Sequence, residues 1–280
     1  MLLLFPFSLF ALAALAQTSD VALAPTDPEQ PAIQACISYY FQAGDHASAA
    51  ELSAAFHPGA LMFWVDDTGL MQHLTQTQWK AQLRATQVPT PATKRTIVLV
   101  DRTGDVAVAR LTSEFSDRVY YDYMNLVKIA GRWQIVTKVF HRAGAPGGTQ
   151  PVANLAADRQ QIEQLLATKF RAMDTSDPDL LARAYHPRTQ SYYTDENQLV
   201  AVSIGEWEAR YAADRRAQTP APTAVRTIRQ IDCLGTVGYS RFTHTFPNGQ
   251  VVTDYTLLLK IENQWRIVGL LITNNQGIGK

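Results

Sequence analysis

The chain contains one pattern twice, and this duplication constrains its fold more than any other feature. Residues 122–136 read DYMNLVKIAGRWQIV and residues 254–268 read DYTLLLKIENQWRIV. In each copy, two apolar runs rich in strand-forming residues flank a short polar break, which is the pattern of a β-hairpin. The match continues outside the hairpins, so the sequence predicts two copies of one domain.

The two copies match over most of their length. The difference in residue number between matching positions is 129 at Ile33 and Ile162 and 131 at Phe115 and Phe246. So small a change requires only small differences in loop length. The segment between the copies is rich in Gly, Pro and small residues and lacks helical or strand periodicity. We therefore predict a first domain at 27–142, a linker at 143–156 and a second domain at 157–273.

Each copy starts with helical patterns and ends with strands. Asp27-Pro28-Glu29-Gln30 predicts a helix start, with Asp27 as N-cap, and a second helix is expected at about 47–56. Thr75–Gln78 and Ser203–Glu206 have the pattern of capping boxes, and Trp79 and Trp207 follow them at the position of a hydrophobic staple. Four strand-like runs follow at 97–101, 106–115, 120–129 and 133–140. Three helices before an antiparallel sheet indicate an α+β fold.

Composition excludes one class of partner. The 280 residues are 46% hydrophobic, and Lys plus Arg and Asp plus Glu both number 25, so no clustered positive charge indicates nucleic-acid binding.

Residues 1–16 are apolar and end in Ala14-Leu15-Ala16, a small-x-small cleavage pattern. The run is shorter than the ~20 residues that span a bilayer. We predict a cleaved signal peptide and a periplasmic or secreted protein with no membrane association after cleavage. Because the run contains no Lys or Arg, a buried or interfacial helix is the alternative.

Cys36 and Cys233 are the only cysteines. An exported protein could join them in a disulfide. Cys36 falls in the apolar helical pattern of Ile33 and Ile37, however, which favours a buried free thiol. The sequence leaves both alternatives open.

The order of elements, with Ala-Phe-His-Pro after the second helix and a terminal DYxxLxK…WxIV hairpin, resembles the nuclear transport factor 2-like superfamily. Within it the chain is most similar to the domains called putative lumazine-binding proteins. The resemblance implies two tandem cone-shaped domains, each with three N-terminal helices packed on a curved antiparallel sheet around a pocket. Enzymes of this superfamily carry Asp, His, Tyr or Arg on the pocket wall, while other members bind without catalysis, so the fold does not determine the function.

His57 and His186 are candidate site residues, because a His at a helix-to-strand corner could face the pocket and exchange protons near neutral pH. A His before Pro also serves as a helix C-terminal cap, which is a structural role. Asp66 and Asp195 end a strand after aromatic residues and could act as acids or bases, although Asp is also a common turn residue.

Strand periodicity divides the terminal hairpin into two faces. Asp122 shares a face with Lys128, and Tyr123 and Tyr255 take the opposite face with Leu257. We expect the tyrosine face to be the interior, which argues against Asp122 as a pocket base. The candidate ligand-binding residues are therefore His57, Asp66, Trp79, Tyr123, His186, Asp195, Trp207 and Tyr255.

Three functions fit these features. The abundant aromatic residues (11 Tyr, 11 Phe, 5 Trp) favour a pocket that binds a small apolar or aromatic molecule. A lyase or isomerase with a His or Asp base is the second reading, and an interaction module with filled pockets is the third. No metal-ligand spacing, phosphate loop or nucleophile elbow occurs, so no metal or cofactor is expected.

The two copies are expected to pack through their sheets as an intrachain pseudo-dimer, which makes the mature chain a monomer. Fusion raises the effective concentration of one copy near the other to roughly millimolar. Leu126 and Leu258 are predicted near the centre of that contact.

The signal-peptide prediction is tested by mass spectrometry of the natively expressed protein. We expect an N-terminus at or near Gln17, because the cleavage pattern ends at Ala16. Recovery of a soluble chain that retains Met1 would contradict cleavage.

Overall fold

The computed structural model describes residues 27–149, 151–153 and 155–273, so the expected signal peptide lies outside the described residues. Both terminal hairpins are present, as predicted. In the first, Ala130 and Gly131 form the turn with φ of 46° and 81°, and in the second Glu262 and Asn263 have φ of 49° and 62°. Positive φ at both central residues matches the twist of the flanking strands. Gly and Asn tolerate this conformation best.

The first copy contains three helices and six strands. They are α1 (Gln30–Asp45), α2 (Ala49–Ala55), β1 (Phe56–Val65), β2 (Met71–Thr75), α3 (Gln76–Thr86), β3 (Lys94–Thr103), β4 (Val106–Glu114), β5 (Val119–Ile129) and β6 (Arg132–Ala143). The sheet order is β2-β1-β6-β5-β4-β3. All neighbours are antiparallel except β1 and β6, which run parallel.

The second copy repeats this order. Its elements are α4 (Ala156–Thr175), α5 (Pro178–Ala184), β7 (Tyr185–Asp195), β8 (Gln198–Ser203), α6 (Ile204–Ala217), β9 (Val225–Leu234), β10 (Val237–Thr245), β11 (Val251–Ile261) and β12 (Gln264–Ile272). The sheet order is β8-β7-β12-β11-β10-β9, with the same single parallel pair, β12 and β7. The chain thus has the tandem α+β fold expected from its sequence.

Local details differ from the sequence expectations. The first helix begins at Gln30 rather than at Pro28. Residues 28 and 29 form a turn, and the Asp27 side chain accepts hydrogen bonds from the Glu29 N–H and from Arg102. The short strands β2 and β8 were not predicted. Each is an edge strand that pairs only with its hairpin partner. A strand stabilised on one side needs no strong apolar alternation, so its sequence signal is weak.

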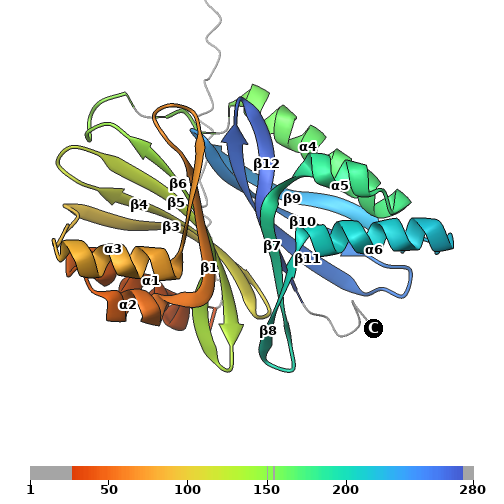
Figure 1. Ribbon diagram of the computed structural model, residues 1–280, viewed down its shortest axis with the longest axis horizontal. Helices are drawn as coiled ribbons and strands as arrows, with labels where there is room; N and C mark the ends of the chain where they lie inside the picture. Colours follow the sequence, from red (N-terminus) through yellow and green to blue (C-terminus); the bar gives the residue numbers. More distant parts are fainter. Residues whose placement is uncertain (1–26, 150, 154, 274–280) are drawn as a thin grey trace, which may run out of the picture.

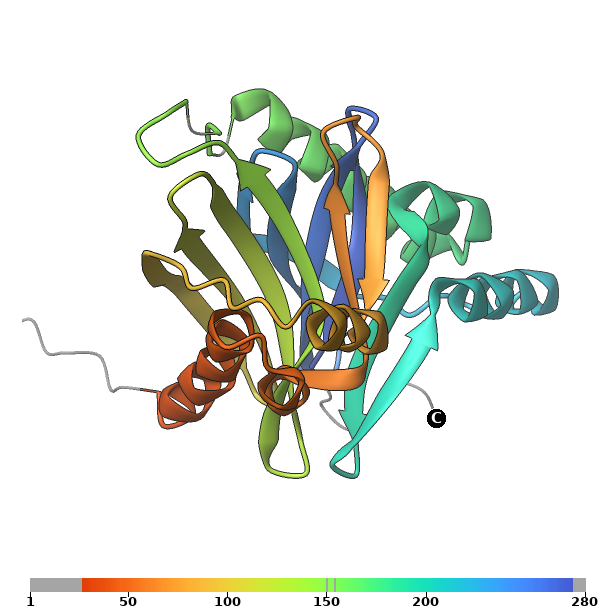
Figure 2. The same cartoon turned by 60° about the vertical axis from the view of Figure 1, so that its left-hand side comes forward.

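The two sheets pack face to face in the middle of the molecule, and the helices lie on the outer sides (Figure 1). One cluster of buried apolar residues joins them, including Phe63, Val127 and Tyr123 from the first copy and Leu257 and Tyr239 from the second. Two further clusters lie between each sheet and its own helices, and α1 to α3 cover the free face of the first sheet (Figure 2).

This packing corrects the assignment of the hairpin faces. Tyr123 and Tyr255 belong to the cluster between the sheets, whereas Leu126 and Leu258 belong to the two helix-facing cores. The expected positions of Leu126 and Leu258 were therefore wrong. Both faces of each sheet are buried, one by helices and one by the other sheet, so apolar alternation alone could not say which face is which.

Polar contacts repeat across the sheet interface with approximate two-fold symmetry. Arg110 donates a hydrogen bond of 2.9 Å to Asp232, which also accepts one of 3.0 Å from the Tyr123 hydroxyl. In the other direction, Arg241 and the Tyr255 hydroxyl each donate to Asp101 at 3.0 Å. The three residues involved match between the two copies. The same set of contacts therefore occurs twice, related by the approximate two-fold axis.

We expect Asp232→Ala to lower the free energy of unfolding by about 1–3 kcal/mol, because the change leaves Arg110 and the Tyr123 hydroxyl without their acceptor. Urea denaturation measures this difference. Asp67→Ala is the control, because the Asp67 side chain is 90% exposed and its ion pair with Arg142 spans 3.8 Å. The control should stay within about 0.5 kcal/mol of the parent. Equal effects of the two substitutions would contradict the role of the interface contact.

Candidate functional site

Each domain contains a cavity between its helices and the concave face of its sheet. The cavity in the first domain, here the first cavity, has a volume of about 320 Å³. Aromatic side chains form much of its wall, from α1, β1, α3, β4–β5 and β6; they are Tyr40, Trp64, Trp79, Phe115, Tyr120 and Phe140. Three basic residues also line it: Arg95, Arg118 and Lys138.

A buried ion pair forms the floor of the first cavity. The Lys138 ammonium on β6 lies 3.0 Å from a carboxylate oxygen of Asp122 on β5, and the exposure of the two side chains is 6% and 0%. The Tyr40 hydroxyl donates a hydrogen bond of 2.7 Å to the same carboxylate. Burial lowers the pKa of Lys138, although Asp122 opposes this shift. Burial, reinforced by Asp122, raises the pKa of Tyr40.

Aromatic rings surround the Lys138 ammonium. Its Nζ lies 4.5 Å from the ring centroid of Phe140, 4.9 Å from that of Tyr40 and 5.8 Å from that of Trp79. Aromatic faces stabilise a desolvated cation. The cage therefore helps to hold the ammonium at the cavity wall.

Two arginines occupy the wall farther from the floor. Arg95 pairs with Asp45 at the end of α1 and donates 3.1 Å to the Ser113 hydroxyl, with its guanidinium over the Phe41 ring. The buried Nε–H of Arg95 has no partner among the described residues. Arg118 lies over the rings of Phe115 and Tyr120, at 4.7 Å and 5.8 Å from their centroids.

The cavity in the second domain, here the second cavity, has a volume of about 220 Å³. It has fewer aromatic wall residues, Tyr185, Trp207, Tyr211 and Phe246, and more aliphatic ones. Charged and titratable side chains of both signs line it: Lys169, Asp214, Arg226, His244 and Asp254.

The second cavity also has a buried ionic group. Asp254 accepts a contact of 3.3 Å from the Lys169 ammonium on α4 and one of 3.1 Å from Nε2 of His244 on β10. Burial alone would raise the pKa of Asp254, but His244 and Lys169 together hold it below its usual value. A carboxylate held in this way is a weak proton acceptor. The Nδ1 atom of His244 is buried without a partner among the described residues.

The two cavities place their lysine on different elements. The offset at Ile33 and Ile162, 162 − 33 = 129, puts Lys169 of the second copy at the position of Tyr40. The offset at Trp133 and Trp265, 265 − 133 = 132, puts Leu270 at the position of Lys138. The carboxylate stays on the sheet, while its cation comes from β6 in one copy and from α4 in the other.

Of the eight residues predicted from the sequence, Trp79 and Trp207 line the cavities. Both follow a complete capping box, as expected. Each is half-buried rather than fully buried, and the Trp207 indole N–H donates 2.7 Å to the Ser191 hydroxyl.

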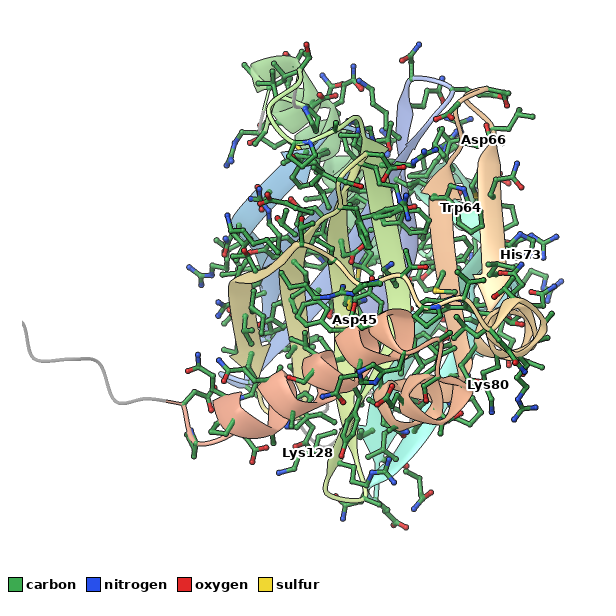
Figure 3. The ribbon with its side chains drawn as sticks, turned by 90° about the vertical axis from the view of Figure 1, so that its left-hand side faces the viewer. Asp45, Trp64, Asp66, His73, Lys80 and Lys128 are labelled. Atoms are coloured by element: carbon green, nitrogen blue, oxygen red, sulfur yellow. The ribbon has the colours of Figure 1, made fainter. Side chains whose placement is uncertain are left out.

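The other six predicted residues do not line either cavity. His57 and His186 lie at the start of β1 and β7, where Nδ1 of each accepts from the backbone N–H two residues later. Asp66 closes the β1–β2 turn with Thr68 and Gln72, at the end of β1 (Figure 3). Asp195 is exposed at the matching turn, and Tyr123 and Tyr255 lie between the sheets. A direct role of these residues in ligand binding stays a prediction.

Sequence reasoning missed the residues that carry the ionic floor. Asp122 and Asp254 were placed on the wrong face, and Lys138, Lys169 and His244 have no matching counterpart in the other copy. Comparison of the copies selects shared positions, so it passes over residues that differ. The available signal was a charged residue within an otherwise apolar stretch, such as Lys138 in Thr-Lys-Val-Phe or Lys169 beside the core residue Phe170.

Among the described residues, no group of His, Cys, Asp and Glu could hold a metal ion, and no helix is long and apolar enough to span a membrane. Cys36 and Cys233 are buried and are not joined in a disulfide. Burial raises the pKa of the Cys36 thiol to about 12.

Comparison with known proteins gives one family match. The profile of the family described as "Putative lumazine-binding" matches residues 28–141 and again residues 157–270. No curated protein matches the chain.

Several solved structures resemble it, each over less than half of this chain. A nuclear transport factor 2-like protein of unknown function from Shewanella baltica is 28% identical, over 41% of this chain and 94% of that chain, with a TM-score of 0.39. Similar proteins of unknown function come from Silicibacter pomeroyi (20% identity, 42% and 95% coverage, TM-score 0.36) and Methylobacillus flagellatus (21%, 45% and 98%, 0.38).

The histidines predict a pH dependence of stability. Burial lowers the pKa of His57, His141 and His186 below the usual value of 6.5. Below pH 6.5 the unfolded chain therefore binds protons that the folded chain does not, so these groups stabilise the fold above that pH. This contribution is lost as the pH falls through their folded-state pKa values.

We expect the free energy of unfolding to decrease between pH 7 and pH 5, measured by urea denaturation. The double variant His57→Asn, His186→Asn should show a shallower decrease, because Asn can also accept a local backbone hydrogen bond. His46→Gln is the control, because His46 is exposed at the end of α1. An unchanged slope in the double variant would show that other groups set the pH dependence.

Proposed function

Because the chain belongs to the "Putative lumazine-binding" family in two tandem copies, we propose that it is an exported pocket protein that binds a small apolar or aromatic molecule in each domain. The observation that carries this proposal is the pair of cavities, each walled by apolar and aromatic side chains around a buried ionic group. Export rests on the signal-like sequence of residues 1–16.

The cavities have the character of small-ligand sites. Such sites are mostly apolar and contain a few fixed polar groups that orient the ligand. Volumes of about 320 and 220 Å³ suit a small aromatic molecule. Arg95 lines the first cavity and Arg226 the second, and the guanidinium of each is a donor group suited to a ligand acceptor.

The geometry favours binding over the two alternative functions. A lyase or isomerase needs a base in the cavity. His57 and Asp66 lie outside the first cavity, and Asp122 and Asp254 are paired with lysines. His244, which contacts Asp254, and Asp214 line the second cavity, so among the described residues a base is present there only. An interaction module with filled pockets would leave no room for a ligand, whereas both domains retain open volume. The sheet interface within the chain supports a monomeric mature protein with one ligand per domain.

Fluorescence titration with N-phenyl-1-naphthylamine, a neutral aromatic probe, tests the proposal. We expect a saturable rise in emission with about two probes per chain, because each domain has its own cavity. Lumazine, which the family description names, should be titrated in parallel as a second probe.

Trp79→Leu and Trp207→Leu should each weaken binding at their own cavity and leave the other unchanged. Trp133→Phe is the control, because Trp133 is buried near the start of α1, donates to Glu29 and lines neither cavity. Absence of saturable binding, or equal affinity in the double Trp79→Leu, Trp207→Leu variant, would overturn the proposal.

A further inference from the structure

We propose that the two cavities have diverged in charge, so that the first selects an aromatic organic anion, such as an aryl carboxylate or sulfonate, and the second selects an uncharged ligand. This inference rests on the proposed binding function and specifies the ligand class for each domain. The relevant observation is which charged groups reach each cavity wall.

Among the described residues, every charged side chain at the wall of the first cavity is a cation. Arg95, Arg118 and Lys138 line it, while their carboxylate partners Asp45, Asp117 and Asp122 do not. Each carboxylate neutralises its cation from behind. A ligand in the cavity is therefore closer to three positive groups than to any of the three negative ones, and it lies in a positive local field.

The second cavity presents both signs. Asp214 and Asp254 line it together with Lys169 and Arg226, so an anion would approach two carboxylates as well as two cations. The turn that carries Arg118 in the first copy reads Phe-Ser-Asp-Arg-Val-Tyr at 115–120, whereas the second copy reads Phe-Pro-Asn-Gly-Gln-Val-Val at 246–252 and contains no basic residue. The third cation is thus specific to the first domain.

The aromatic wall of the first cavity supports the same ligand class. Six aromatic residues line it, against four in the second cavity. The Arg118 guanidinium lies 4.7 Å from the ring centroid of Phe115 and 5.8 Å from that of Tyr120, while its partner Asp117 is 61% exposed. An aromatic anion would stack on the rings and place its charged group beside the guanidinium, which presents a fork of donors suited to a carboxylate or sulfonate.

Two probes that differ mainly in charge test the inference: N-phenyl-1-naphthylamine and its sulfonated relative 1-anilinonaphthalene-8-sulfonate. In the Trp207→Leu variant, which reports mainly on the first cavity, we expect the sulfonate to bind about 3- to 10-fold more tightly than the neutral probe. In Trp79→Leu, which reports mainly on the second cavity, the preference should disappear or reverse. Added salt should weaken only the sulfonate.

Arg118→Gln should weaken the sulfonate about 3- to 10-fold and leave the neutral probe unchanged, because the substitution removes a partly exposed charge without emptying the core. Arg210→Gln is the matched control: Arg210 lies 4.8 Å from the ring centroid of Trp207 but lines neither cavity. Its affinity for both probes should equal that of the parent. The double variant Asp122→Asn, Lys138→Met removes the buried pair together and should also weaken the sulfonate.

The outcomes separate the two proposals. Binding of the neutral probe without a preference for the sulfonate in the first cavity overturns this inference and leaves the proposed function standing. The same conclusion follows if Arg118→Gln and Arg210→Gln have equal effects. Failure of both probes to bind overturns the proposed function and this inference with it.

Discussion

The face-to-face packing of the two sheets is the contact on which the rest of the structure depends. A single six-stranded sheet covered by helices on one side would expose an apolar face to water, and burial of that face is worth about 25 cal/mol per Å². Here each sheet uses the other as its cover, with Tyr123, Leu257 and their neighbours in the contact. Because the other sheet covers this face, the helices and any ligand must both lie on the opposite face of the sheet. The cavities therefore lie between sheet and helices, away from the domain interface.

The fold could be predicted from the sequence to a large extent, because duplication supplies an internal comparison. The hairpins at 122–136 and 254–268, the capping boxes before Trp79 and Trp207 and the strands of the main sheet all have strong local signals. The short edge strands β2 and β8 did not, since they pair on one side only. The contact between Asp27 and Arg102 across the domain was not predicted either, because no local pattern encodes it.

The candidate site was much less predictable, and the reason is physical. Strand periodicity separates the two faces of a strand, but it does not say which face the helices cover when both are buried. Tyr123 was therefore expected to face the pocket and lies between the sheets, whereas Asp122 was expected to face away from the pocket and pairs with Lys138 beside it. The internal comparison also favoured residues retained in both copies, such as His57 and His186. Those positions hold the shared backbone in place. Arg95 and Arg226 match between the copies, but Lys138, Lys169 and Arg118, which make the two cavities differ in charge, do not.

The different placement of the two cavity lysines limits how the halves of this gene can recombine. A hybrid domain with the helices of the first copy and the sheet of the second would combine Tyr40 with Leu270, leaving the buried Asp254 in contact with His244 but without an ammonium. The reciprocal hybrid would combine Lys169 with Lys138 and bury two ammonium groups against one carboxylate. An unpaired buried charge costs several kcal/mol. Both kinds of hybrid domain are therefore less stable than the parent domains. This cost would allow two halves of common origin to evolve separately.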